Sequence, residues 1–162
     1  MTRREGSKFL GLSLAALGLG GGFAKAAAPA EVFEVTKTDA EWKAMLSPEA
    51  YSTLRHEGTE RPNSSALVSE HRKGMFNCAG CDLSLFESAT KFESGTGWPS
   101  FYDHLPNAVV MKSDDTFFMT RTEVHCHRCG GHLGHVFDDG PKPTGLRYCM
   151  NGVAMKFTPV AA

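Results

Sequence analysis

The 162-residue sequence has no excess of positive charge, no internal repeat and no long unbroken run of large apolar side chains. It holds 17 Lys and Arg against 18 Asp and Glu, and residues 1–26 contain four of the basic side chains but one acidic one, so the remaining chain carries a net charge of −4. A mildly acidic body does not attract phosphates, which argues against nucleic acid as a partner. With 41% hydrophobic and 22% charged residues, the length predicts one folded domain.

One uncharged stretch, Phe9–Ala24, is rich in Leu, Ala and Gly and follows a basic start at Arg3 and Arg4. It is shorter than the roughly 18 to 20 residues that span a bilayer, and small residues around Lys25 complete the order of a cleavable secretory signal. We therefore expect residues 1–26 to be a signal peptide for export to a bacterial periplasm, with no stable membrane insertion after its removal. The arginine pair makes a twin-arginine route an alternative to the general one.

Residues 27–34 are expected to form a linker, and residues 35–158 the domain. Residues 38–56 have a helical pattern, in which Asp39 is the expected cap of a first turn and Ser47-Pro48 begins a second one. A loop over residues 58–65 follows.

The rest of the domain alternates short apolar runs with turn clusters, which is typical of β-strands. The expected strand regions are Gly74–Phe76, Ala108–Met111, Thr116–Thr122, His132–Phe137 and Leu146–Phe157, with a hairpin turn at residues 113–115 and a rigid loop over residues 140–145. The predicted fold class is mainly β with a small helical N-terminal cap.

Four of the five cysteines form two C-x-x-C pairs, Cys78 with Cys81 and Cys126 with Cys129. Two such knuckles supply four thiolates in a tetrahedron, the closed geometry of a structural zinc site, and the ion would clip together two distant hairpins. Disulfides are the alternative in an exported protein, but a bridge within C-x-x-C is strained and redox-labile. The spacing favours one structural Zn²⁺ per chain.

Cys149 is the remaining thiol, and a strand at this position places Arg147, Cys149 and Asn151 on one face. A nearby guanidinium favours the thiolate over the thiol, and the Asn151 amide adds a hydrogen-bond donor. These neighbours indicate a reactive cysteine, whereas a buried inert cysteine is the common alternative.

His132 and His135 follow the second knuckle and offer side chains that titrate near neutral pH, suited to delivering a proton to a leaving oxygen. Their alternative roles are those of hydrogen-bonded turn histidines or of zinc ligands, and the four available cysteines argue against the second. Trp98, in the segment Gly97–Phe101, can form an aromatic wall of a site or belong to the core.

Together these segments resemble the B type of the methionine-R-sulfoxide reductase family over roughly residues 35–157. The matching stretches are Gly58–Pro62, the two knuckles, Lys91–Phe101, His132–Phe137, Asp139–Pro141 and Pro143–Asn151. The resemblance implies two antiparallel sheets curled over each other and clipped by the four-cysteine zinc site. It also implies an oxidoreductase that repairs oxidised methionine, free or in proteins, with a thioredoxin-like protein or a small thiol as reductant. We expect a monomer.

The resemblance gives Cys149 the role of the nucleophile that attacks the sulfoxide sulfur and becomes a sulfenic acid. It places His132, His135 and Asn151 around the sulfoxide oxygen, which must be protonated.

On the substrate side the resemblance implies Trp98 and Phe137, with Trp98 receiving the S-methyl group. It places Arg147 near the nucleophile, held by an acid for which Asp139 is the candidate. Thr96 departs from the pattern, because many relatives carry a resolving cysteine there. An external thiol is therefore expected to recycle the sulfenic acid.

Two other functions fit part of the sequence. A zinc-clipped, non-catalytic binding module on the same β scaffold accounts for the knuckles but leaves Cys149 and the histidines unexplained. A thiol peroxidase or disulfide oxidoreductase accounts for a reactive cysteine, but the thioredoxin-like βαβ pattern is missing.

Overall fold

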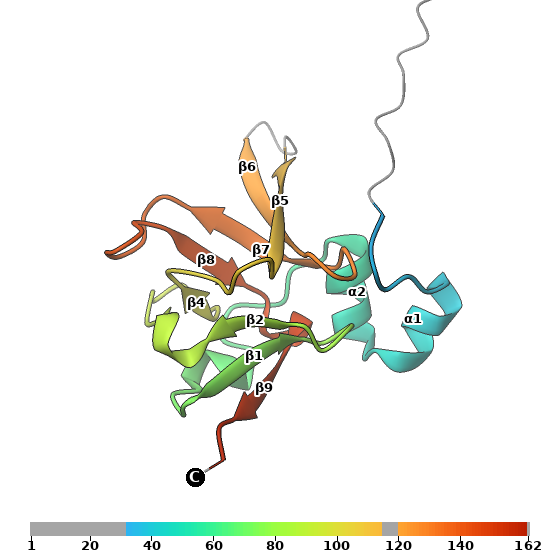
Figure 1. Ribbon diagram of the computed structural model, residues 1–162, viewed down its shortest axis with the longest axis horizontal. Coiled ribbons are helices and arrows are strands. Elements are labelled where there is room, and N and C mark those ends of the chain that lie inside the picture. Colours follow the sequence, from blue (N-terminus) through green and yellow to red (C-terminus); the bar gives the residue numbers. More distant parts are fainter. Residues whose placement is uncertain (1–31, 115–119, 162) are drawn as a thin grey trace, which may run out of the picture. The chain divides into compact units, whose positions relative to one another are not determined.

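The computed structural model describes residues 32–114 and 120–161, and Figure 1 shows their arrangement. The expected signal peptide and most of the expected linker lie outside the described residues. In the part of the chain that is described, no helix combines the length and the apolar character needed to cross a membrane.

Two short helices, α1 (Asp39–Met45) and α2 (Pro48–His56), precede the strands. The Ser47 hydroxyl accepts a hydrogen bond from the Ala50 amide at the start of α2, as expected for an N-cap followed by proline. The cap of α1 is Thr38 and not Asp39, because the Thr38 hydroxyl and the Glu41 carboxylate form a reciprocal capping box. Asp39 is instead the first helical residue.

The strands form two antiparallel sheets, which confirms the predicted fold class. The three-stranded sheet has the order β2-β1-β9, and the six-stranded sheet has the order β3-β4-β8-β7-β6-β5. The strands are β1 (Gly74–Cys78), β2 (Ser84–Glu87), β3 (Lys91–Phe92), β4 (Ser100–Phe101), β5 (Val109–Asp114), β6 (Arg121–Cys126), β7 (His132–Phe137), β8 (Arg147–Met150) and β9 (Met155–Pro159). Short 3₁₀ turns are η1 (Ala66–Ser69), η2 (Ser88–Thr90) and η4 (Gly152–Ala154).

Two of the expected strand boundaries are wrong. Ser113 and Asp114 belong to β5, where they pair with Thr122 and Arg121 of β6, so the hairpin turn does not begin at residue 113. The Asp114 carboxylate is buried between these paired strands, where it accepts a hydrogen bond from Arg121. Residues 115–119, which include the start of the expected strand Thr116–Thr122, lie outside the described residues.

The expected strand Leu146–Phe157 is two strands in different sheets. β8 ends at Met150, η4 turns the chain, and β9 continues in the three-stranded sheet. The crossing places Asn151 at the junction of the two sheets.

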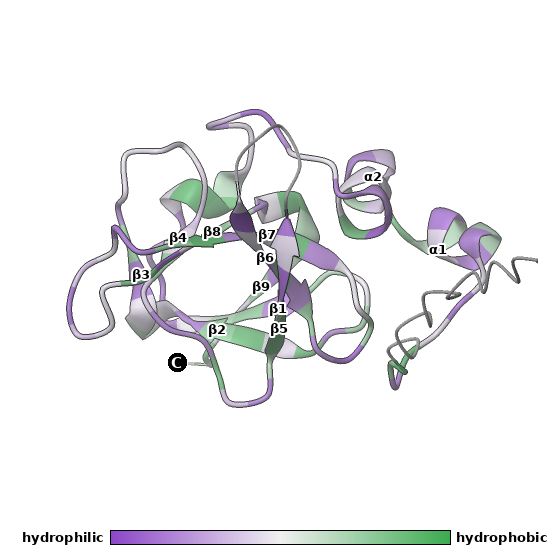
Figure 2. Ribbon diagram, turned by 90° about the horizontal axis from the view of Figure 1, so that it is seen from above, coloured by the Kyte–Doolittle hydropathy of each residue, from purple (hydrophilic) through white to green (hydrophobic). Residues whose placement is uncertain are grey.

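Aromatic side chains from both sheets form the centre of the core. Phe76 of β1 and Phe86 of β2 contact Phe101 of β4, with ring centroids 4.9 and 4.3 Å apart, and Tyr148 of β8 packs against Phe86. Burying each ring contributes roughly 1.5 to 3 kcal/mol, so these contacts hold the two sheets together. Figure 2 shows the hydrophobic colouring concentrated on the strands, while the connecting loops are mostly hydrophilic.

Candidate active site and metal centre

One face of the six-stranded sheet collects the polar side chains of the site. Cys149 of β8 pairs with His135 of β7, which pairs with Glu123 of β6. Because paired residues in neighbouring strands point to the same face, these three side chains share it. The adjacent row, in which Met150 pairs with Gly134, belongs to the buried face. Strand register therefore brings Cys149 and His135 together.

A cavity of about 160 Å³ opens over Cys149. This volume is below the roughly 300 to 1,000 Å³ of sites for drug-sized ligands, so the cavity takes the end of one side chain or a similarly small group. Its walls contain aromatic, basic and amide side chains. The lining residues are Thr59, Trp98, Arg121, Gly134, His135, Phe137, Cys149 and Asn151.

The Cys149 thiol is half-buried, and burial raises its pKa above the ordinary value. A hydrogen bond from Thr96, whose Oγ1 lies 3.9 Å from the Cys149 sulfur, and the charge of Arg147 act in the opposite direction. The charge of Arg147 thus acts in the direction that favours the thiolate. Desolvation is nevertheless the larger effect, so Cys149 rests as a thiol at neutral pH.

Arg147 is held where the resemblance placed it. Its guanidinium makes two hydrogen bonds of 2.8 Å to the Asp139 carboxylate and lies 4.4 Å from the ring centroid of Phe137. A bidentate pair and a ring face fix the plane of the guanidinium. Arg147 does not line the cavity itself, and both its charge and a side-chain hydrogen bond to the Cys149 sulfur favour the thiolate.

Trp98 and Asn151 are fixed by one loop residue, Glu60. The Trp98 indole donates to the Glu60 carbonyl at 3.2 Å, and the Asn151 carbonyl oxygen accepts from the Glu60 amide at 3.0 Å. The Glu60 carboxylate in turn accepts from the amides of Gly152 and Val153 at 2.6 and 3.0 Å. This loop residue therefore holds the Trp98 ring against the end of β8.

Asn151 lines the cavity and has one amide hydrogen that is not used in the hydrogen bond to Leu133. The other amide hydrogen bonds the Leu133 carbonyl at 3.1 Å, and a primary amide has two.

His135 lines the cavity, and its Nε2 lies 3.1 Å from the Asp114 carboxylate, which also accepts a 2.6 Å bond from Arg121. His132 is not part of the cavity wall. It is almost completely buried and lies behind His135, with ring centroids 5.4 Å apart. Burial lowers the pKa of His132 to about 4, so its imidazole is neutral at pH 7. His135 thus lies at the wall of the cavity, whereas His132 lies beneath it in the interior.

Sequence reasoning did not identify Thr59, Arg121, Asp114 or Glu123 as part of this region. Arg121 and Glu123 alternate along β6, so a correct strand boundary would have placed them on one face. Their meeting with β7 depends on the cross-strand register, which the sequence pattern does not encode.

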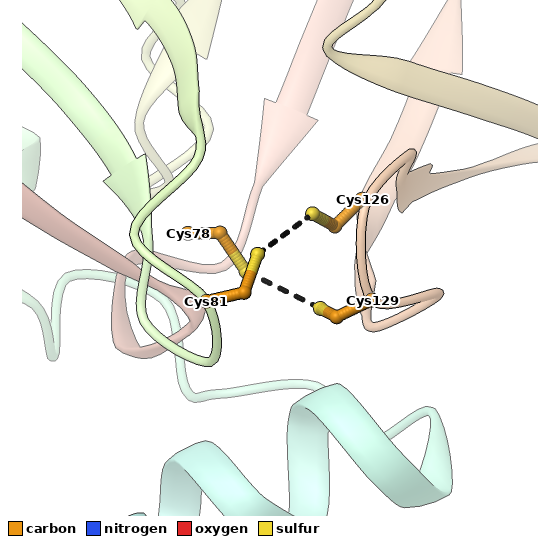
Figure 3. A group of neighbouring side chains, drawn as sticks. All are labelled: Cys78, Cys81, Cys126 and Cys129. Carbon is orange, nitrogen blue, oxygen red and sulfur yellow. Dashed lines mark hydrogen bonds between the residues drawn. The ribbon is translucent and has the colours of Figure 1, made fainter. Parts of the chain in front are cut away.

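The four knuckle cysteines converge, as Figure 3 shows. The Cys78 and Cys129 sulfurs are 3.7 Å apart, the Cys81 and Cys126 sulfurs 3.5 Å, and all four lie within 4.8 Å of one another. A tetrahedron with zinc–sulfur bonds of 2.3 Å has edges of about 3.8 Å, whereas a disulfide has sulfurs about 2.05 Å apart. The cluster fits a metal ion, and its thiols are free.

Both knuckles have the same backbone turn. The amide of the first cysteine donates to the carbonyl five residues later, and its carbonyl accepts from the amide four residues later, in Cys78 as in Cys126. The fourth following residue, Asp82 or Gly130, has positive φ, which lets the turn close. One knuckle connects β1 to β2 and the other β6 to β7, so an ion here links the two sheets.

Comparison with known proteins gives consistent matches. The family model of the SelR domain matches residues 46–159. The peptide methionine sulfoxide reductase MsrB of Methanosarcina barkeri is 56% identical over 124 residues, which are 76% of this chain and 87% of that protein. The proteins of the same name from Methanosarcina mazei and Agrobacterium fabrum are 54% and 53% identical, over 77% and 78% of this chain and 90% and 95% of their own.

Proposed function

The chain belongs to the MsrB family of peptide methionine sulfoxide reductases, and from this premise we propose that it reduces the R epimer of methionine sulfoxide with the sulfur of Cys149. The substrate is methionine sulfoxide in proteins or as the free amino acid. The relatives are named as enzymes, which favours this function over a non-catalytic binding module on the same scaffold.

The observation that carries the proposal is the division of the cavity around Cys149. Trp98 and Phe137 offer an apolar surface to an S-methyl group, while His135 and Asn151 offer polar groups to an oxygen. A tetrahedral sulfoxide with its methyl group on one side and its oxygen on the other presents its sulfur to Cys149 in one configuration. The same division explains selection of one epimer.

The net chemistry moves one oxygen from the substrate to the enzyme in two steps. The Cys149 sulfur attacks the sulfoxide sulfur and forms an S–S bond, while the sulfoxide oxygen takes up two protons, its S–O bond breaks and it leaves as water. Water then attacks the Cys149 sulfur, the S–S bond breaks, the substrate leaves as a thioether and one proton is released, so that thiol plus sulfoxide gives sulfenic acid plus sulfide.

The proton for the oxygen is available on Cys149 itself, because burial keeps the resting thiol protonated. His135 is the residue proposed to transfer it. A carboxylate can only accept, so Nε2 facing Asp114 carries a hydrogen, and Nδ1 is left to exchange a proton in the cavity. Arg147 stabilises the sulfur as it loses its proton, since its charge favours the thiolate.

Recycling uses an external thiol. Thr96 Oγ1 lies 3.9 Å from the Cys149 sulfur, and a hydroxyl cannot form a disulfide. Two thiols from a small molecule or a thioredoxin-like protein convert the sulfenic acid to thiol, disulfide and water.

Zn²⁺ is the ion proposed for the four-cysteine cluster, in a structural role. Four thiolates complete its tetrahedron, so the ion supplies stability and no open position for chemistry.

Export and domain organisation complete the proposal. Residues 1–26 are proposed as a cleaved signal, residues 27–34 as a linker and residues 35–158 as a monomeric periplasmic domain. The order of basic, apolar and small residues at the start of the sequence supports this.

The test is turnover of each epimer of N-acetyl methionine sulfoxide with dithiothreitol as reductant. Cys149→Ser should abolish R reduction while circular dichroism and zinc content stay unchanged, because only the nucleophile is removed. His135→Asn should lower kcat about 100-fold with a small change in KM, since proton delivery matters in the transition state. Activity retained by Cys149→Ser would exclude the mechanism, and equal activity on the S epimer would exclude the stereochemistry.

A further inference from the structure

Behind His135 lies a second cluster of metal-binding side chains, distinct from the knuckles. Glu123 and His125 of β6 and His132 of β7 each direct one donor atom to a common point, with all three atoms within 4.8 Å of one another. The histidines are 4% and 1% exposed, so this is an interior site.

The hydrogen bonds of His125 require a cation beside its Nε2. Its Nδ1 lies 3.1 Å from the Gly130 carbonyl oxygen, and its Nε2 lies 2.9 Å from a Glu123 carboxylate oxygen. A carbonyl only accepts, so Nδ1 carries a hydrogen. In a neutral ring, Nε2 then directs its lone pair at a carboxylate, which is repulsive unless a proton or a metal ion lies between them.

His132 supplies the second, independent observation. Neither of its ring nitrogens has a hydrogen-bond partner among the residues that the structure describes, although the side chain is fully buried. Its Nδ1 lies 3.5 Å from the other Glu123 oxygen. Buried polar groups are almost always satisfied, so an orphaned imidazole beside a carboxylate points to a ligand. The neutral ring at pH 7 is the form that binds metals.

The distances fit an ion with nitrogen and oxygen ligands. Bonds of 2.0 to 2.1 Å place neighbouring ligand atoms about 2.9 to 3.4 Å apart, depending on the angle between them. The separation of 2.9 Å between His125 and one Glu123 oxygen lies within this range, and that of 3.5 Å between His132 and the other oxygen lies slightly beyond it. The bond from His125 Nδ1 to Gly130 is the type that orients a metal-bound imidazole through its other nitrogen.

We propose that Glu123, His125 and His132 form a second metal site, which takes a divalent transition metal of the zinc and cobalt class. Two imidazoles and a carboxylate suit such ions and leave a coordination position for water.

Cobalt is the probe, because its visible absorption distinguishes the two kinds of site. Full-length protein with zinc in the knuckles is mixed with excess Co²⁺, desalted and analysed for metal content and absorption. We expect one further metal per chain, with ligand-field bands but no thiolate-to-cobalt charge transfer. Glu123→Gln and His125→Gln should each bind it at least about tenfold more weakly, since loss of even an outer-shell partner costs that much.

His127→Gln is the matched control. His127 lies two residues from His125, inside the second knuckle, and is exposed and outside the cluster. It should retain full cobalt binding, and circular dichroism should show that all variants fold.

Three results would overturn the proposal. Wild type that takes up no second metal would mean that a proton or a water molecule joins His125 to Glu123. Equal uptake by His125→Gln would identify surface binding only. Bound cobalt whose only new absorption is thiolate-to-cobalt charge transfer would have displaced the knuckle zinc and not entered a second site. Inactive protein that still binds the second metal would count against the proposed function and leave the metal site intact.

Discussion

Replacing Thr96 by cysteine should change the product of the first turnover from a sulfenic acid to a disulfide with Cys149. Thr96 Oγ1 and the Cys149 sulfur are 3.9 Å apart, so an introduced thiol must move about 2 Å to reach disulfide length. The turn has room to move on one side, because Gly95 has a φ of 72° and no atom within 4 Å of where a Cβ would lie.

The expected stabilisation follows from the length of the closed loop. Positions 96 and 149 are 53 residues apart, and closing such a loop lowers the entropy of the unfolded chain by an amount worth roughly 4 kcal/mol at 25 °C. For a domain of this size that corresponds to a rise in melting temperature of roughly 10 to 20 °C, and strain in the new bridge reduces it. The oxidised variant should therefore melt higher than its reduced form.

The assay compares thiols and mass after a single turnover. Reduced enzyme receives excess R-sulfoxide and no reductant, and a sulfenic-acid trap is added before mass spectrometry. Wild type should lose one thiol, gain one oxygen atom and keep its zinc, whereas Thr96→Cys should lose two thiols and gain no oxygen.

Thr96→Ser and the double variant Thr96→Cys/Cys149→Ser are the controls. The first keeps the hydroxyl and should behave as wild type, and the second should form no disulfide. A stable sulfenic acid in Thr96→Cys would show that the two positions do not meet. An internal disulfide in wild type, with loss of zinc, would show that a knuckle cysteine resolves the sulfenic acid and would refute the reasoning.

Three further predictions concern the thiol, the metal and export. Burial raises the pKa of Cys149 and Arg147 opposes that shift, so the rate of alkylation by iodoacetamide should rise with pH to a midpoint above that of an ordinary thiol. Arg147→Met should move this midpoint to still higher pH. A lower midpoint in that variant would contradict the direction assigned to the effect of Arg147. Purified protein should contain about one zinc in the knuckles. Cys126→Ser should lose the metal and several kcal/mol of stability together, as measured by metal analysis and denaturant unfolding. A metal-free variant that unfolds like wild type would exclude a structural ion. Changing Arg3 and Arg4 to lysine should leave the protein in the cytoplasm on cell fractionation, whereas undisturbed export would indicate the general route.

The sequence predicted those features of the fold that depend on local pattern. The strand His132–Phe137 and the cap at Ser47 are confirmed, because alternation and capping chemistry are properties of neighbouring residues. The short strands β2, β3 and β4 were missed, since two to four residues show no measurable period. Pairing with longer strands, and not their own propensity, makes them strands.

The same distinction between local pattern and long-range strand pairing applies to the site. The convergence of the four cysteines follows from two spacings, and the pairing of Arg147 with Asp139 follows from the resemblance. The layering of His132 behind His135 could not be predicted. It arises from the register shift between Val124 and His125, which pairs His125 with His132 and carries both histidines into the interior.

The charge state of Cys149 shows why neighbours in sequence were insufficient. Arg147 is two residues away and acts in the predicted direction, but a guanidinium already paired with Asp139 stabilises the thiolate less than an unpaired one. Burial by β4 and β7 on either side of β8 costs the anion its hydration, and that effect is larger. A resting thiol follows, and with it a chemical advantage. In the proposed mechanism, the group that loses a proton and the oxygen that gains one meet only when substrate fills the cavity, which would couple proton transfer to attack on the sulfoxide.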